Sequence, residues 1–196
     1  MIVIIEGMDR CGKSTLIGNL RKYLMTKPTT LVHHSSAPPK GLDDPNGWEV
    51  VHYSAMFKLA QDLQLEGWDI IFDRLHLGAV VYGQKYRGMD PERIYKVDAF
   101  YMTRWRAELA NEFALILLTD YPEEISKRDD GLGLEKDLAD LENTRTSFLA
   151  AYDRSLVPHR LHINISDNGG FENTLPTVIS FLLKMRAHND AARKAN

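Results

Sequence analysis

Short apolar segments alternate with longer amphipathic segments along this chain. The apolar runs are rich in β-branched residues and far too short to cross a bilayer, so they predict buried strands. The amphipathic segments have the three- and four-residue spacing of helices, as at Leu16, Leu20 and Leu24. Strands are predicted at 2–5, 29–33, 69–73, 113–119 and 160–166, and helices at 16–24, 48–66, 75–84, 90–111, 120–128, 135–154 and 172–188.

This alternation of strands and helices predicts an α/β fold, in which a five-stranded parallel sheet has helices on both faces. The length of 196 residues suits a single domain over 1–196. Segments rich in turn-forming residues predict a binding loop at 35–47 and a short lid at about 129–135. We expect the tail at 189–196 to fray.

The first predicted strand leads directly into the stretch Gly7-Met8-Asp9-Arg10-Cys11-Gly12-Lys13-Ser14-Thr15. Its spacing is that of a P-loop, the phosphate-binding turn of P-loop NTPases. The two glycines permit backbone conformations in which amide N–H groups face a phosphate, and the following helix adds partial positive charge. Lys13 can reach the outer phosphates, and the Ser14 hydroxyl suits Mg²⁺. The stretch therefore predicts a nucleotide-binding site and a P-loop NTPase fold.

A second informative stretch is the end of the strand predicted at 69–73, where Asp73 is followed by Arg74. In parallel α/β sheets, ligands gather at the carboxyl ends of the strands. Asp73 is therefore placed to hold Mg²⁺ or its waters, and Arg74 to bind a phosphate. The alternative is a salt bridge with no role beyond the strand end. His76 follows closely and is expected to be a polar wall residue.

Composition excludes several classes of protein. The apolar fraction of 44% and charged fraction of 26% are those of a globular protein. A net charge of −3 gives no reason to expect nucleic-acid or membrane partners. Cys11 is the single cysteine, which excludes an internal disulfide and a cysteine-based zinc site. Since a strand is predicted from residue 2, we expect no targeting peptide and a cytoplasmic location.

These motifs resemble those of the thymidylate kinases. The segment from Glu6 to Thr15 is similar to the family's E-G-x-D-R/G-x-G-K-S-T. Asp73-Arg74, with Tyr82 nine positions after the aspartate, is similar to D-R-Y-x-x-S-G-x-A-Y. The segment 115–128 resembles L-x-L-D-x-x-P-E-E-x-x-x-R, and the order and spacing are kept over residues 1–165.

The resemblance implies a phosphoryl transfer from ATP, with Mg²⁺, to a deoxynucleoside monophosphate, which converts dTMP to dTDP. Asp9 would bond the acceptor's 3′-hydroxyl, and Arg10 would reach across the transferring group. Arg74 would hold the acceptor phosphate, Tyr82 would pack beside the deoxyribose, and Arg128 would come from the lid helix. Because Arg10 is in the P-loop and the segment 129–134 has no arginine, the chain resembles the P-loop-arginine type.

The base that is accepted stays open. The family's F-S-A-N-R, whose aromatic residue stacks on thymine and whose arginine bonds a base oxygen, has its nearest match in Tyr53-Ser-Ala-Met-Phe57. A match shifted to begin at Phe57 ends in Gln61, whose amide could suit other bases. Both lack the arginine. We therefore expect Tyr53, Phe57 or Gln61 to contact the base, with its identity undecided.

Three further possibilities follow from the sequence. The enzyme could phosphorylate a deoxynucleoside or a modified nucleotide. A deoxynucleoside acceptor requires a general base near its 5′-hydroxyl, and Glu6, the nearest carboxylate, is expected to face the core instead. The chain could instead be a nucleotide-binding switch or ATPase module. A homodimer is also possible, because the helix predicted at 48–66 has an apolar face of Val51, Ala55, Leu59 and Leu63, and the helix at 75–84 has another.

Overall fold

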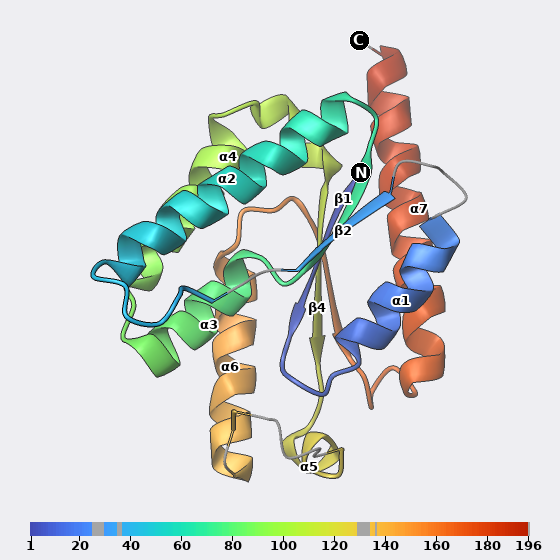
Figure 1. The fold of residues 1–196 in the computed structure, drawn as a ribbon. Coiled ribbons are helices and arrows are strands. Elements are labelled where there is room, and N and C mark those ends of the chain that lie inside the picture. The colour runs from blue at the N-terminus through green and yellow to red at the C-terminus, as the bar shows by residue number, and fades with distance from the viewer. Residues whose placement is uncertain (25–29, 35–36, 129–133, 136, 196) are drawn as a thin grey trace.

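A parallel sheet of five strands forms the centre of the computed structural model, which describes residues 1–24, 30–34, 37–128, 134–135 and 137–195 (Figure 1). The strand order is β2-β3-β1-β4-β5 and every pair is parallel. The prediction of a five-stranded parallel sheet is therefore confirmed. The strands are β1 (Ile2–Gly7), β2 (Thr30–His34), β3 (Asp69–Asp73), β4 (Phe113–Thr119) and β5 (His159–Asn164).

Helices cover both faces of this sheet. In Figure 1, α1 and α7 lie on one side, and α2, α3, α4 and α6 lie on the other. This arrangement is the one predicted from the alternation of strands and helices. The helices are α1 (Lys13–Leu24), α2 (Pro45–Leu65), α3 (His76–Arg87), α4 (Pro91–Thr103), α5 (Pro122–Ser126), α6 (Leu138–Arg154) and α7 (Phe171–Ala195), with a 3₁₀ helix, η1, at Ala107–Glu112.

The inner strands of the sheet run through the core. Every residue of β1 and of β4 is buried, whereas the edge strands β2 and β5 are only partly buried. Continuous apolar runs fit this position, because helices cover both faces of a central parallel strand. The register places Ile5 of β1 opposite Asp73 and Gly7 opposite Leu118. The carboxyl ends of three strands therefore meet beside the P-loop.

Glu6, at the end of β1, fixes the start of α3. Its carboxylate is fully buried and accepts hydrogen bonds from the backbone N–H groups of Leu75 and Leu77, at 2.7 and 2.9 Å, and of Gly78, at 3.1 Å. A negative charge at a helix N-terminus is favourable and satisfies donors that have no partner within the helix. This contact holds the beginning of α3 against the P-loop strand.

Several helix boundaries differ from the predictions. The helix predicted at 90–111 ends at Thr103, and a residue with left-handed backbone, Arg106 (φ 50°), precedes η1. Asp44, whose side chain accepts from the N–H of Gly47, caps α2, which begins three residues before the predicted start, and Asp137 caps α6, which begins three residues later than predicted. Residues 189–195, which we expected to fray, continue α7.

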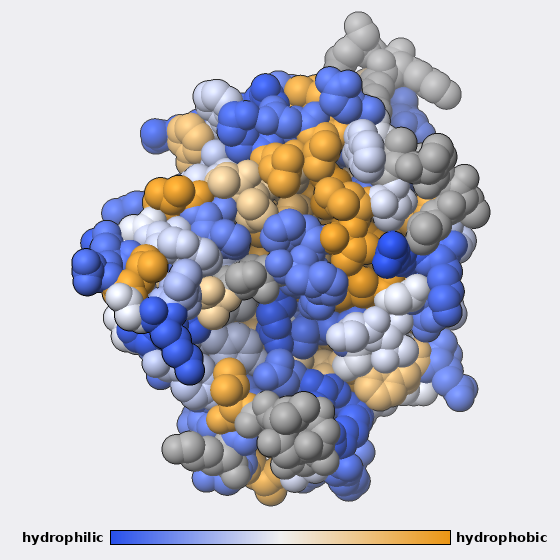
Figure 2. All heavy atoms as spheres, viewed as in Figure 1, coloured by the Kyte–Doolittle hydropathy of each residue, from blue (hydrophilic) through white to orange (hydrophobic). Residues whose placement is uncertain are grey.

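The apolar face noted on the helix predicted at 48–66 lies at the surface. Val51 is 70% and Leu59 38% exposed, and Leu31 of the neighbouring β2 is 37% exposed. Figure 2 shows apolar side chains gathered over α2 and beside the open edge of β2. The side of α2 that faces the protein instead buries Glu49, Tyr53, Phe57, Ala60 and Gln61.

Candidate active site

The P-loop joins β1 to α1 through two glycines with positive φ, Gly7 (140°) and Gly12 (70°). A side chain at Gly7 would overlap the carbonyl oxygen of Leu118 in β4, and one at Gly12 would overlap the ring of Phe171. Glycine is therefore needed at Gly7 for both its backbone conformation and its close packing against the neighbouring strand.

We expect Gly7→Ala to lower the free energy of unfolding by about 3 kcal/mol or more, because a methyl group there meets backbone that cannot move aside. Gly18→Ala in α1 is the matched control, since nothing lies within 4 Å of the added Cβ. It should stabilise the protein by up to about 1 kcal/mol through helix propensity. Urea unfolding of both variants measures the difference, and equal midpoints would contradict the close packing of Gly7.

Lys13 is buried at the start of α1. Its Nζ donates to the carbonyl oxygen of Met8 at 2.6 Å and lies 3.9 Å from a carboxylate oxygen of Asp9. Burial, with the nearby positive charge of Arg74, lowers the pKa of Lys13 to about 8. Cys11 is fully buried, and burial raises the pKa of its thiol to about 12, so the thiol is not a nucleophile near neutral pH.

Arg74 and Asp9 form the centre of the site. The Arg74 guanidinium donates to the carbonyl oxygen of Gly7 at 2.6 Å and to the Asp9 carboxylate, and its Cζ lies 5.0 Å from the ring centre of Tyr82. Arg74 has a left-handed backbone (φ 63°), an uncommon conformation for a residue with a side chain. Such strain is concentrated at functional sites.

Arg10 shares this backbone conformation, with φ 63°. Its side chain is 8% exposed, and its guanidinium lies 3.9 Å from the buried carboxylate of Glu135. Glu135 also accepts a hydrogen bond from the hydroxyl of Tyr82 at 3.4 Å. Glu135 therefore links the P-loop to α3. Apart from Leu134 and Glu135, the predicted lid lies outside the described residues.

Ser14 and Asp73 line one cavity, as the predicted Mg²⁺ site requires. Asp73 also lies 3.0 Å from the Nδ1 atom of His34, a residue at the end of β2 that the sequence did not single out. Mg²⁺ keeps several waters and takes one or two protein oxygens together with substrate phosphates. A hydroxyl and a carboxylate beside the phosphate-binding loop fit this requirement.

Arg128 lies two residues after the end of α5 and lines the same cavity. It forms an ion pair with the fully buried Asp120, lies 4.9 Å from the ring centre of Phe171, and donates to the carbonyl oxygen of Arg10 at 3.4 Å. Sequence reasoning missed Asp120 and Phe171, although Asp120 follows an apolar strand as Asp73 does. The cavity has a volume of about 580 Å³ and is lined by Asp9, Arg10, Gly12, Lys13, Ser14, Thr15, Asp73, Arg74, Arg128 and Phe171.

A second, smaller cavity of about 190 Å³ adjoins the first, because Asp9 and Arg74 line both. Helix α3 forms one wall of it and Tyr53 of α2 contributes to another. Its lining consists of Asp9, Ala37, Tyr53, Arg74, Leu75, Gly78, Ala79, Tyr82, Arg87 and Leu134.

Two predicted base contacts lie in the core and not in this cavity. Phe57 is fully buried, with its ring stacked 5.4 Å from that of Tyr101. Gln61 is also buried, and its amide donates to the carbonyl oxygens of Tyr101 and Trp105, at 3.4 and 3.2 Å, where α4 ends. His76 is likewise buried and its Nε2 lies 2.9 Å from the Ser155 hydroxyl, away from the site.

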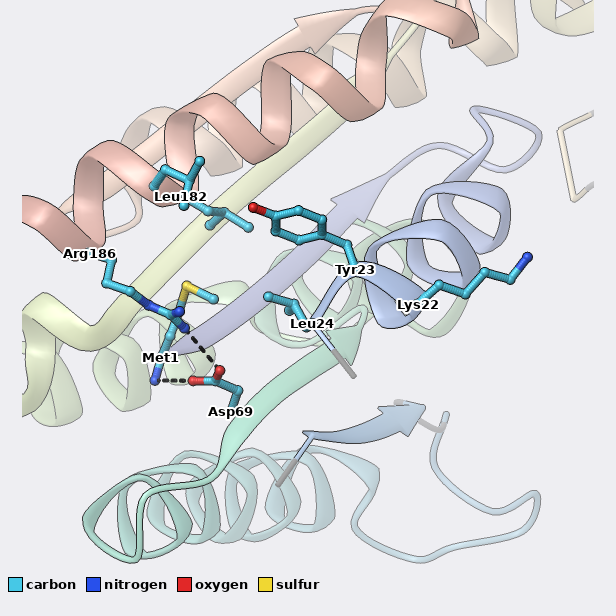
Figure 3. Close-up of a pocket in the computed structure, with 8 residues that line it drawn as sticks. Met1, Lys22, Tyr23, Leu24, Asp69, Leu182 and Arg186 are labelled. Carbon is cyan, nitrogen blue, oxygen red and sulfur yellow. Dashed lines mark hydrogen bonds and ion pairs between the residues drawn. The ribbon is translucent and has the colours of Figure 1, made fainter. Parts of the chain in front are cut away.

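A third cavity, apolar and of about 540 Å³, lies at the other end of the sheet, beside the amino ends of β1 and β3 (Figure 3). Leu24, Leu182 and Tyr23 form its apolar walls, and Asp69 pairs with Arg186 at 3.0 Å on its floor. Since it lacks the P-loop and the strand carboxyl ends, it is not the candidate active site.

Among the described residues, no helix has the length and apolar character to span a membrane.

Comparisons with known proteins identify the fold. The YorR protein of Bacillus subtilis, in complex with phosphorylated GDP, is 18% identical over 96% of this chain and 98% of its own, with a TM-score of 0.67. The thymidylate kinase of Candida albicans is 18% identical over 96% and 92%, with a TM-score of 0.56. The deoxyadenosine kinase of M. mycoides with bound dCTP is 15% identical over 94% and 100%, with a TM-score of 0.53.

The sequence itself matches no protein-family model. It also matches no curated protein. At 15–18% identity the structural likeness establishes the fold alone: the chain has the fold of these P-loop kinases.

Proposed function

We propose that this protein transfers the γ-phosphoryl group of ATP to a nucleoside monophosphate, with Mg²⁺. One observation supports this most directly: the polar cavity at the P-loop and the smaller cavity along α3 meet at Arg74 and Asp9. A donor triphosphate in the first and an acceptor in the second would bring their phosphates together there.

In this proposal the P-loop and Lys13 hold the donor phosphates, and Arg74 binds the acceptor phosphate. Arg10 neutralises the negative charge that spreads over the transferring oxygens, since a guanidinium stays charged and delocalised. Asp9 and Tyr82 position the sugar of the acceptor. Arg128, held by Asp120, lies beside the donor, and Mg²⁺ at Ser14 and Asp73 would add charge neutralisation at the phosphates. Transfer is direct and in line, so positioning and electrostatics provide the catalysis.

Two acceptors are compatible with the site. The motif resemblance favours dTMP, with Tyr53 as the aromatic wall beside the base. A guanine nucleotide is the second candidate, because YorR, the structure with the TM-score of 0.67, was solved with phosphorylated GDP. A free deoxynucleoside is disfavoured for two reasons. The carboxylate of Glu6 is bonded to the start of α3, so it cannot act as the general base that a nucleoside hydroxyl would need. Arg74, in addition, suits an acceptor that carries a phosphate.

The experiment that tests the proposal is ADP release with ATP and Mg²⁺ in the presence of each ribo- and deoxyribonucleoside monophosphate and each free nucleoside. Stimulation by at least one monophosphate supports the proposal. Stimulation by nucleosides alone would contradict the role of Arg74. Slow ATP hydrolysis that no acceptor changes would favour a switch or ATPase module.

Lys13 should give the reaction a characteristic pH dependence. Lysine is charged below its pKa, and in the free protein this pKa is lowered to about 8. We therefore expect kcat/KM for ATP to fall about tenfold per pH unit above pH 8, whereas kcat changes less, because bound phosphates favour the charged lysine. A profile that stays flat to pH 10 would contradict this prediction. Lys13→Arg, which stays charged, should lose the fall at pH 8 even if its activity is low.

We also propose that the protein forms a homodimer through the exposed apolar face of α2. The helix at 75–84 contributes no such face, since residues 76–83 are buried. We expect Val51→Glu to shift the protein from dimer to monomer in sedimentation. If the variant and the wild type had the same mass in sedimentation, an interface at this face would be contradicted.

A further inference from the structure

A half-buried ion pair joins α2 to α3 at the proposed acceptor cavity, and the proposed mechanism does not use it. Nη2 of Arg87 donates to Oε1 of Glu49 at 3.0 Å. Glu49 is 1% exposed, whereas Arg87 is partly exposed and lines the cavity. Burial raises the pKa of Glu49 and the bond to Arg87 opposes that rise. A charge buried with one partner is costly, so such pairs are often kept for a reason other than stability.

Arg87 of this pair lines the cavity proposed for the acceptor. A Cβ at Gly78 would be 3.4 Å from Cδ of Arg74, the proposed phosphate ligand. A Cβ at Gly83 would be 3.3 Å from Nη2 of Arg87 and 3.4 Å from Oε2 of Glu49. The two glycines are five residues apart on α3, about 7.5 Å along the helix axis. That separation suits a phosphate at one end and a base at the other.

The two side chains require complementary groups on the base. A carboxylate only accepts hydrogen bonds and a guanidinium only donates them. Oε1 of Glu49 accepts from Arg87, and in the part of the chain that the structure describes Oε2 accepts no hydrogen bond, so this oxygen has unused acceptor capacity. The pair therefore fits an edge that presents N–H donors next to a carbonyl oxygen.

Guanine has this edge. It offers the N1–H and N2–H₂ donors side by side, with the O6 acceptor adjacent. Adenine and cytosine present an unprotonated ring nitrogen, which a carboxylate repels, and thymine presents a single N–H between two carbonyl oxygens. Two small residues of α3 line the cavity, Gly78 and Ala79, and leave room for a purine beside the flat ring of Tyr53.

We infer that Glu49 and Arg87 recognise a guanine base, which makes GMP or dGMP the preferred acceptor. The inference rests on the proposed function and specifies its substrate class. Glu49 would accept the N–H donors of guanine, and Arg87 would donate to O6 while it stays bonded to Glu49. Both act as specificity-determining residues and do not touch the transferring phosphoryl group.

The test measures kcat/KM with dGMP, its inosine analogue dIMP, which lacks the N2 amino group, and dTMP. In the wild type we expect dGMP to exceed dIMP by about tenfold, the range for one hydrogen bond to a charged group. Glu49→Gln should lower the value for dGMP by about 100-fold and remove the preference over dIMP. Glu66→Gln, an exposed site at the end of the same helix, should leave both values unchanged.

Two outcomes would overturn the inference and spare the proposed function: a preference for dTMP, or a dGMP preference over dIMP that Glu49→Gln leaves intact. If no monophosphate supports turnover, the proposed function fails and calorimetry with GMP and dGMP decides the inference separately. Binding that weakens in Glu49→Gln would uphold it, and an absence of binding would overturn it. Thermal unfolding of Glu49→Gln shows whether a loss of activity or binding comes from misfolding. If the variant is misfolded, Glu49→Asp is tested with the same nucleotides in its place.

Discussion

Replacing Arg10 with alanine is expected to lower kcat by about a thousandfold while both substrates bind nearly as well as before. An arginine that neutralises the transferring phosphoryl group is worth 10³–10⁵ in rate in P-loop enzymes. The structure supports this role by position: Arg10 lines the phosphate cavity, its side chain is 8% exposed, and its carbonyl oxygen accepts from Arg128. A charge held in this way needs little rearrangement during the reaction.

The backbone of Arg10 provides the control. Because φ is 63°, Arg10→Gly removes the side chain and also relieves strain, whereas Arg10→Ala keeps the strain. Both variants should lose kcat equally, and the glycine variant should be the more stable of the two. Arg21→Ala, on the exposed side of α1, should change neither quantity. Full transfer activity in Arg10→Ala with normal binding of both nucleotides would refute the catalytic role.

The fold could be predicted because its main signals are local. The run at 113–119 has no polar residue until its last position, and the structure buries all seven residues as β4. The P-loop has a fixed spacing in the sequence, and its two glycines adopt the positive φ values that this motif predicts. The break after Thr103 involves a distant residue instead, because the side-chain amide of Gln61 in α2 donates hydrogen bonds to two backbone carbonyl oxygens at that helix end. No pattern within residues 90–111 contains this information.

The acceptor pocket was harder to predict for a related reason. Tyr53, Phe57 and Gln61 are spaced four residues apart, so all three lie near one side of α2. Only the packing against α4 shows that Phe57 and Gln61 belong to the core, while Tyr53 reaches the cavity. Glu49, one turn earlier, continues the same row, but a lone glutamate in a helix is normally a solvated residue. Its pairing with Arg87 becomes visible only when α3 is placed beside α2.

The second large effect is expected at Arg74, whose replacement by alanine should raise KM for the acceptor monophosphate about a hundredfold. Hydrogen bonds between a guanidinium and a phosphate are charge-assisted, and losing two of them costs on the order of 3 kcal/mol. The KM for ATP should change much less, because in the proposed mechanism Lys13 and the loop amides hold the donor phosphates. Initial rates with each substrate varied in turn measure the two constants.

A comparison of Arg74→Gly with Arg74→Ala separates the side chain from the backbone. The left-handed φ of 63° is costly for alanine and not for glycine, so the glycine variant should be more stable by about 1 kcal/mol. Its acceptor KM should nevertheless match that of the alanine variant, because neither has a guanidinium. If the glycine variant regained acceptor affinity, the effect would come from strain at the end of β3. If both variants kept the wild-type KM for the acceptor, the acceptor phosphate would bind elsewhere. The proposal that donor and acceptor phosphates come together at Arg74 and Asp9 would then be wrong.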